Sequence, residues 1–337
     1  MFKVKYRLLL LSFLLIFGGI LSACSSNSSK ESADPAAKTV SSSSTSSSTS
    51  AEDDSAVTSE ENGTRQYKDF SGREAIIPVH PKRVILLGDS PGDLLALGVK
   101  PIGNDFLGEA YIYKSELEGI ADIGFPHNLE KIMSLAPDLI LQSADNDASD
   151  TEIYEKMNKI APTVLYNRGA DTYTRIREIA NILGVKQVAE DWITRYEDKA
   201  QKMWDKLDLK KGETATVYLS LAGQFYVMGD YSLTMFLYDP RGFSPTAKVQ
   251  ELIDKKEFFT EISAETLPDY AGDYIFLLSL PGSKDEKAAK QLLESPIWKT
   301  IPAVKEGRVT FGDISWNASD PITRERMLDE LPKWLGK

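Results

Sequence analysis

Short apolar runs alternate with amphipathic segments along the chain from about residue 80. Runs of four or five mostly apolar residues are typical of parallel strands that are covered on both faces, and they occur at residues 83–87, 138–141 and 163–166. Apolar residues that recur every three or four positions predict helices, and these patterns lie at residues 93–97, 128–135 and 153–160. The pattern before them, around Ser71-Gly72, predicts a hairpin over residues 67–78. The alternation of strands and helices predicts an α/β lobe with a mostly parallel sheet.

A much longer helix follows this lobe. From Gln187 to Leu209 apolar residues recur at three- and four-residue spacing, with charges on the other faces. This pattern predicts a helix of about 33 Å at 1.5 Å per residue. A last helix begins at Asp320-Pro321, an N-cap followed by proline, and strand patterns resume between the two helices at residues 216–221, 225–228, 274–278 and 308–311. The predicted fold is therefore α/β, with two lobes that each have a mostly parallel sheet flanked by helices, joined by one long rigid helix.

The first residues have the pattern of an export signal. A basic start precedes an apolar run over residues 8–21, which is too short to cross a bilayer comfortably. The sole cysteine follows in Leu21-Ser22-Ala23-Cys24, which resembles the bacterial lipobox. In proteins with that motif the signal is removed before the cysteine, whose thiol then carries diacylglycerol. We expect a signal peptide over residues 1–23 and a lipid on Cys24 that anchors the protein at the extracellular face of the cell membrane.

Composition narrows the possible classes of function. The net charge is −11, and it becomes −14 without the three basic residues of the signal, which argues against nucleic acid as a partner. One cysteine excludes a disulfide scaffold, and two histidines argue against a multi-histidine metal cage. Residues 25–60 hold 15 serines and no aromatic residue, so they cannot bury enough apolar surface to fold. The expected organisation is a disordered tether over 24–63, a first lobe over 64–170, helices over 171–210 and a second lobe over 211–337.

The two lobes share a short repeated sequence pattern. Glu130 precedes Asp138 by eight residues, and Glu265 precedes Asp273 by the same interval, with a strand pattern after each aspartate. Each glutamate is also the second residue after a good N-cap, Asn128 in the first lobe and Ser263 in the second. The repeated spacing supports two related lobes.

These stretches resemble the solute-binding lipoproteins of ABC importers for ferric siderophores and vitamin B12, most closely the ferric hydroxamate binders of Gram-positive bacteria. The resemblance implies a monomer of the class III periplasmic-binding-protein type, with a ligand in the cleft between two lobes that close slightly on binding. It implies no enzymatic activity and no cofactor, because the protein delivers an iron(III)-siderophore complex to a permease dimer with a cytoplasmic ATPase. The matching segments run in order through residues 81–84, 95–103, 128–132, 136–140, 271–276 and 298–309.

The resemblance also suggests roles for particular residues. One exposed glutamate in each lobe docks on basic residues of the permease, and Glu130 and Glu265 stand at those positions. Trp316 matches an aromatic position of the family. The arginine and tryptophan that commonly contact the ligand are absent from the loop before Asn128 and from residues 229–234. Cobalamin and haem are the alternative ligands of the same importer class.

Loops at the carboxyl ends of strands are the expected ligand positions in α/β lobes. Besides Trp316, the candidates in these loops are two aromatic residues, Tyr226 and Tyr231, and two basic residues, Arg168 and Arg241. His127 is a possible iron or haem ligand. A siderophore wraps its iron, so the protein need not supply metal ligands. The candidate loops are rich in aspartate, which would repel a polyanionic catecholate or citrate complex. The composition therefore predicts that the protein binds a neutral or cationic ferric hydroxamate more tightly. These aspartates are Asp89, Asp105, Asp145, Asp147 and Asp230.

Two other classes of function can be weighed against a binding protein. Gly88-Asp-Ser90-Pro-Gly92 fits the nucleophile-elbow pattern of serine hydrolases between a strand and a helix. However, the only histidine downstream of Ser90 is His127, 37 residues on, and the alternative is a turn in which Ser90 or Asp89 caps the helix. A cell-wall adhesion module would suit the serine-rich tether, but no repeat or anchoring motif accompanies it. No nucleotide-binding P-loop motif is present, so energy for transport must come from a partner.

Overall fold

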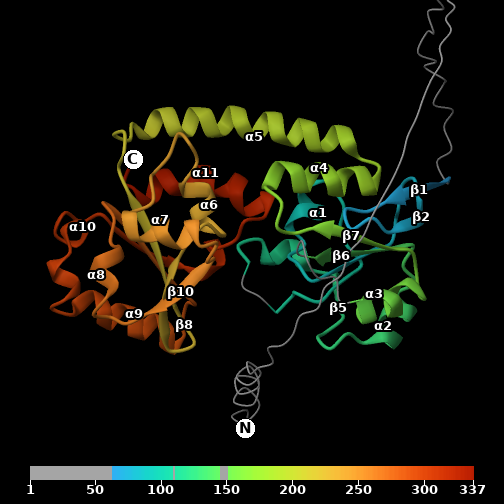
Figure 1. Ribbon diagram of the computed structural model, residues 1–337, viewed down its shortest axis with the longest axis horizontal. Coiled ribbons are helices and arrows are strands. Elements are labelled where there is room, and N and C mark those ends of the chain that lie inside the picture. The colour runs from blue at the N-terminus through green and yellow to red at the C-terminus, as the bar shows by residue number, and fades with distance from the viewer. Residues whose placement is uncertain (1–62, 109–110, 145–150) are drawn as a thin grey trace, which may run out of the picture. The chain divides into compact units, whose positions relative to one another are not determined.

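Figure 1 shows the protein as a computed structural model, which describes residues 63–108, 111–144 and 151–337. The chain divides into two units, Met1–Val57 and Thr58–Lys337, and all features below belong to the second. The predicted signal, the lipidation site Cys24 and nearly all of the tether lie outside the described residues. No helix among the described residues is long and apolar enough to span a membrane.

The first lobe contains a parallel sheet preceded by a hairpin. The hairpin pairs β1 (Thr64–Lys68) with β2 (Glu74–Pro78) in antiparallel register, as predicted. The sheet has the order β5-β4-β3-β6-β7, and every neighbouring pair is parallel. All four residues of β3 are buried, as expected for a strand covered on both faces. The strands are β3 (Val84–Leu87), β4 (Gly103–Asn104), β5 (Ala121–Asp122), β6 (Leu139–Ala144) and β7 (Thr163–Asn167).

Short helices connect these strands. They are α1 (Gly92–Ala96), η1 (Lys114–Leu117), α2 (Leu129–Ser134) and α3 (Thr151–Asn158). The predicted cap of α1 is wrong, because Pro91 occupies the N-cap position without a side-chain hydrogen bond. Asp89 instead accepts a hydrogen bond from the adjacent Ser90 amide at 2.7 Å.

The second lobe repeats the strand order of the first. Its sheet has the order β10-β9-β8-β11-β12, in which β9 is antiparallel to both neighbours and the other pairs are parallel. The strands are β8 (Ala215–Leu221), β9 (Gln224–Met228), β10 (Phe259–Ile262), β11 (Tyr274–Ser279) and β12 (Val309–Asp313). The helices are α6 (Leu233–Leu237), α7 (Ala247–Asp254), α8 (Leu267–Tyr270), α9 (Lys284–Glu294), η2 (Trp298–Thr300), α10 (Pro302–Lys305), η3 (Ile314–Trp316) and α11 (Pro321–Trp334). The equivalent orders confirm two related α/β lobes.

One long helix joins the lobes. The 22-residue α5 (Lys186–Leu207) packs against α4 (Thr172–Leu183), which follows the first sheet, and against α11, which covers the second (Figure 1). Its inward stripe is buried, as the three- and four-residue spacing predicts. The stripe belongs to a core that draws residues from both lobes and includes Trp192, Tyr196, Ala200, Met203 and Leu207.

A second junction joins α1 and α4 to the start of α11. The Asp320 carboxylate caps α11 by accepting hydrogen bonds from the Thr323 amide at 3.0 Å and the Thr323 hydroxyl at 2.9 Å. It packs so closely on α1 that a Cβ added at Gly92 would lie 2.2 Å from it. Arg175 of α4 donates to the carbonyl of Ser319 at 3.3 Å. The two lobes are therefore joined by buried polar contacts as well as by α5.

Candidate functional site

The carboxyl end of β3 brings two of the predicted site residues to one turn. The Gly88 amide donates to the Asp105 carboxylate at 2.9 Å, and His127 Nε2 lies 2.8 Å from the same carboxylate. From the end of β7, the guanidinium of Arg168 donates to the Gly88 carbonyl at 3.3 Å. His127 is thus paired with Asp105, and among the described residues no hydrogen bond joins it to Ser90 as a hydrolase triad would require. In the described part of the chain, no group of three or more His, Cys, Asp or Glu side chains is arranged to hold a metal ion.

The three predicted aromatic residues lie in two different places. Tyr226 lies inside β9, not in a loop, and its ring meets that of Phe259 edge-on at 5.7 Å. Tyr231 is 39% exposed, with its ring 5.1 Å from Phe258. Trp316 follows β12 in η3 and packs 5.8 Å from Trp334. The first two rings therefore pack beside the edge strand β10, and the third packs against α11.

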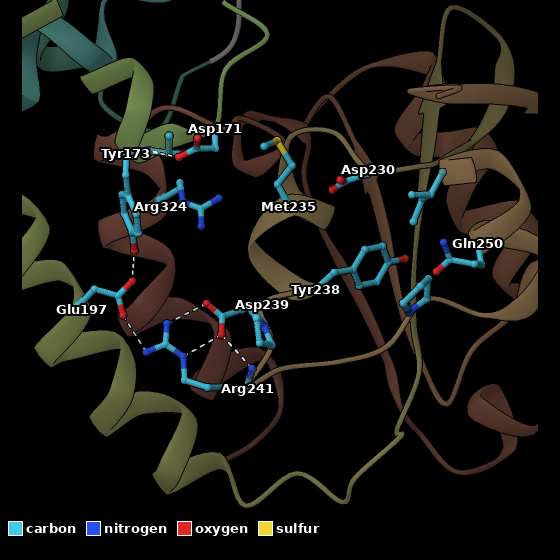
Figure 2. A pocket seen from close by; sticks show the side chains of 14 residues that line it. Asp171, Tyr173, Glu197, Asp230, Met235, Tyr238, Asp239, Arg241, Gln250 and Arg324 are labelled. Carbon is cyan, nitrogen blue, oxygen red and sulfur yellow. Dashed lines mark hydrogen bonds and ion pairs between the residues drawn. The ribbon is translucent and has the colours of Figure 1, made fainter. Parts of the chain in front are cut away.

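A cavity of about 690 Å³ lies between the start of α4, which packs against β7 and α1 of the first lobe, and the second lobe, and we call it the interlobe pocket (Figure 2). The start of α4, after β7, supplies Asp171 and Tyr173, whereas the second lobe supplies residues from Asp230 to Ile253. Glu197 of α5 and Arg324 of α11 complete the wall. The volume is within the range of about 300–1,000 Å³ that small-molecule sites have. Of the residues predicted to bind ligand, Arg241 lines this pocket.

The guanidinium of Arg241 donates hydrogen bonds to two carboxylates that also line the pocket, Asp239 and Glu197. It makes two hydrogen bonds to the Asp239 carboxylate, at 2.7 and 2.8 Å, and one to Glu197 at 2.9 Å. Burial raises the pKa of the Asp239 carboxyl, but the hydrogen bonds from Arg241 and the positive charges of Arg241 and Arg324 together outweigh it and hold that pKa below its usual value. Tyr173 donates its hydroxyl proton to the other oxygen of Glu197. The network fixes the position of α6 relative to α5 and leaves Arg241 with its charge balanced.

Arg324 is a pocket residue that the sequence analysis missed. It is buried, with 8% of its surface exposed, and its guanidinium lies 5.8 Å from the Tyr196 ring and 5.9 Å from the Phe236 ring. A signal for it exists in the sequence. Arg324 shares the three- and four-residue spacing of the buried stripe of α11, which continues through Met327, Leu328 and Leu331. An arginine inside an apolar stripe indicates a guanidinium that points into the structure.

The two glutamates predicted to dock on a permease are exposed, but their local structures differ. Asn128 caps α2 through a 3.0 Å hydrogen bond from the Lys131 amide, and Glu130 is the second residue of that helix, as predicted. The predicted Ser263 cap is wrong, because α8 begins at Leu267 and Glu265 lies in the turn before it. Pro268 explains the later start, since proline is favoured in the first turn of a helix.

The two aspartates of the repeated sequence pattern, Asp138 and Asp273, have equivalent roles. Asp138 accepts hydrogen bonds from the amides of Lys82 (2.7 Å) and Arg83 (2.9 Å), just before the central strand β3. Asp273 accepts a hydrogen bond from the amide of Thr214 at 2.8 Å, just before the central strand β8. The edge strands β5 and β10 also occupy equivalent positions, and each precedes one of the two exposed glutamates. The two glutamates therefore follow equivalent edge strands of the two sheets, although Glu130 lies in a helix and Glu265 in a turn.

Comparison with known proteins decides the family. The periplasmic binding protein family matches residues 122–314, more than half of the chain. The chain belongs to this family. The chain is 31% identical to the iron(3+)-hydroxamate-binding protein YxeB of Bacillus subtilis over 83% of this chain and 87% of YxeB. It is 32% identical to the iron(3+)-hydroxamate-binding protein FhuD of the same organism over 81% of this chain and 87% of FhuD.

A solved structure supports the same assignment. A FhuD fold-family protein of Bacillus subtilis, described as the periplasmic binding protein component of a ferrichrome ABC transporter, superposes with a TM-score of 0.68. It is 32% identical, and the match covers 80% of this chain and 100% of that protein. The two-lobed fold and the family resemblance expected from the sequence are confirmed.

Proposed function

We propose that this chain captures a ferric siderophore of the hydroxamate type outside the cell and delivers it to an ABC importer. The observation that carries the proposal is a pocket of about 690 Å³ between the start of α4 and the second lobe, in a chain whose relatives include proteins named for iron(3+)-hydroxamate binding. A ligand held by both lobes can couple its binding to a change in their relative position. The protein itself performs no bond chemistry in this proposal.

The charges of the pocket favour a ligand that is not an anion. Four carboxyl groups and two guanidinium groups line it. A polyanionic catecholate or citrate complex would meet more negative than positive charge there, and like charges at an interface are unfavourable. A neutral or cationic ferric hydroxamate avoids this repulsion. Its apolar surface can pack against Met235, Tyr238 and Ile253 of the same wall.

Delivery requires contacts outside the pocket. We assign Glu130 and Glu265 to docking on a permease dimer, because both are exposed and follow equivalent strands of the two lobes. Charge pairs at such an interface mainly set orientation and encounter rate. A lipid on Cys24 would keep the binding protein at the extracellular face of the membrane, near the importer.

A thermal-shift panel tests the ligand assignment. The panel contains a ferric hydroxamate, a ferric catecholate, ferric citrate, cobalamin and haem. A ligand at 100 times its Kd stabilises the folded state by about 2.7 kcal/mol, which corresponds to a rise of about 5–10 °C in Tm for a domain of this size. We expect the largest rise with the ferric hydroxamate. A rise with cobalamin or haem alone would contradict the proposal.

A further inference from the structure

The junction where α1, α4 and α11 meet contains more buried acid than base. The short helix α1 packs against both of the others, and Asp93 of α1, Arg175 of α4 and Asp320 at the cap of α11 are all buried. The Nε of Arg175 lies 3.0 Å from the Asp93 carboxylate, and the same guanidinium donates to the Ser319 carbonyl at 3.3 Å. The arginine therefore contacts both sides of the junction, but its ion pair is with Asp93.

Asp320 reaches across this junction from the side of the second lobe. Its carboxylate lies against Gly92, the neighbour of Asp93, so closely that an added Cβ would be 2.2 Å from Oδ1. Its hydrogen bonds come from the amide and the hydroxyl of Thr323 in its own helix. Burial raises the pKa of Asp320 to about 6, the negative charges of Asp93 and Asp89 add to this effect, and the hydrogen bonds from Thr323 oppose it. An acid of the second lobe is thus held against acids of the first.

A third carboxyl, that of Asp89, faces the same junction from the turn after β3. It accepts a hydrogen bond from the hydroxyl of Tyr166 at 3.1 Å. Burial and then the charge of Asp93 raise the pKa of Asp89 to about 6, although the positive charges of Arg175 and Arg168 oppose the change. Three carboxyls and two guanidiniums therefore meet here. The binding of one proton leaves two negative and two positive charges.

Two tyrosines also face these carboxyls, but both stay neutral. Burial and then the charge of Asp320 raise the pKa of Tyr113. Burial and then the charge of Asp89 raise the pKa of Tyr166. Arginine keeps its charge at any ordinary pH, so the carboxyls are the groups of this set whose charge can change between pH 4 and pH 8. The full set of facing groups is Asp89, Asp93, Tyr113, Tyr166, Arg168, Arg175 and Asp320.

We propose that these groups form a proton-operated lock between the lobes: one proton bound by Asp320 or Asp89 tightens the contact of α11 with α1, and loss of that proton loosens it. When all three carboxyls are ionised, Asp320 on one side repels Asp93 and Asp89 on the other, in surroundings that screen charge poorly. The start of α4 also lines the interlobe pocket, so the lock acts on the movement of the lobes around a bound ligand. This last step rests on the proposed function, whereas the lock itself does not.

The sign of the pH dependence follows from the closed junction. Asp320 and Asp89 interact and titrate as a pair, with pKa values of about 6. A contact that raises a pKa binds the proton more tightly when it is closed, so it is strengthened below that pKa and weakened as the pH rises through it. We therefore expect the junction to be tighter at pH 5.5 than at pH 8.

Hydrogen exchange followed by mass spectrometry at pH 5.5 and pH 8 tests the lock without any ligand. Protection is expressed relative to the intrinsic exchange rate at each pH. Peptides that cover α1 and the first turn of α11 should be about tenfold better protected at pH 5.5, which corresponds to a difference of one unit in pKa between the closed and the open junction.

Three variants show which group carries the effect. Asp320→Asn keeps an oxygen that can accept from the Thr323 amide and should be equally protected at both pH values. Asp89→Asn keeps an acceptor for the Tyr166 hydroxyl and should reduce the difference, and it provides the test if the first variant fails to fold. Asp285→Asn is the matched control, because Asp285 also accepts backbone amides, those of Ala222 and Gly223, but lies in α9 outside the junction. It should keep the wild-type difference.

The dissociation rate of a bound ligand tests the link to capture. The probe is ferrichrome, a neutral ferric trihydroxamate that has no group titrating between pH 5.5 and pH 8. Its release requires the lobes to separate, so it should leave the wild-type chain more slowly at pH 5.5 than at pH 8. Asp320→Asn should lose this difference, and Asp285→Asn should keep it.

The outcomes separate the lock from the proposed function. Equal protection of α1 and α11 at the two pH values in the wild-type chain would overturn the lock, and so would a difference that persists in both Asp320→Asn and Asp89→Asn. If exchange depends on pH as expected but ferrichrome binds at neither pH, the lock stands and the proposed function loses its support. If ferrichrome binds and its dissociation rate does not depend on pH, the proposed function stands and the link between the lock and capture is wrong.

Discussion

Replacement of Asp320 by asparagine is expected to stabilise the protein at neutral pH. The Asp320 side chain lies at the junction between the lobes, where the residue is 3% exposed. Burial, with smaller contributions from the neighbouring charges of Asp93 and Asp89, raises its pKa from 3.8 to about 6, although hydrogen bonds from Thr323 oppose the change. Asparagine removes the charge and keeps an oxygen that can accept from the Thr323 amide, since asparagine and aspartate are about equally good N-caps.

The sign and size of the effect follow from proton linkage. The unfolded carboxyl titrates near 3.8, so between that pH and about 6 the folded protein binds more protons than the unfolded one. The free energy of unfolding therefore decreases as the pH rises through this window. The full displacement of the pKa corresponds to about 3 kcal/mol above pH 6. We expect Asp320→Asn to gain about 1–3 kcal/mol at pH 8 and little at pH 4.

Urea unfolding followed by circular dichroism at pH 4 and pH 8 measures this difference. Asp320→Ala serves as the matched control, because it removes the cap as well as the charge. It should be less stable than Asp320→Asn at both pH values by about 1 kcal/mol. An asparagine variant that is less stable than the wild type at pH 8 would show that the ionised carboxylate stabilises the junction, and would refute the reasoning.

Three further predictions concern other parts of the chain. Cys24→Ala should release the protein from the membrane fraction or leave its signal uncleaved, as seen by fractionation and mass measurement; tight membrane association after cleavage would exclude the lipid. Glu130→Ala combined with Glu265→Ala should leave siderophore affinity unchanged and abolish uptake of radiolabelled iron, whereas normal uptake at normal expression would leave these glutamates without a docking role. Arg175→Met removes the partner that lies 3.0 Å from buried Asp93, so it should cost about 3–5 kcal/mol and lower Tm; an unchanged Tm would mean that the pair is not needed.

The central strands and the interlobe helix could be predicted because their signals are local. Buried parallel strands such as β3 are apolar throughout, and the stripe of α5 extends over 22 residues. The edge strand β10 was missed because only one of its four residues is buried, so its pattern differs little from that of a loop. The start of α8 was misplaced because Ser263 and Thr266 are both good caps, and Pro268 favours the later one.

The site was less predictable because its charges are balanced by residues that are distant in the sequence. Arg241 has the sequence context of a free loop arginine, yet Glu197, 44 residues away, pairs with it. Arg324 lies in a helix, outside the loops that follow the strands, although it is the pocket arginine with a buried, unpartnered donor among the described residues. Only the packing of α5, α6 and α11 around one cavity distinguishes the two arginines.

Calorimetric titration of the protein with a ferric trihydroxamate, and with the same chelator without iron, tests the central claim most directly. The account predicts one ferric complex bound per chain and much weaker binding of the iron-free chelator, because the iron holds the hydroxamate oxygens in the compact arrangement that the pocket accepts. Absence of binding by any ferric hydroxamate, together with one-to-one binding of haem or cobalamin, would contradict it.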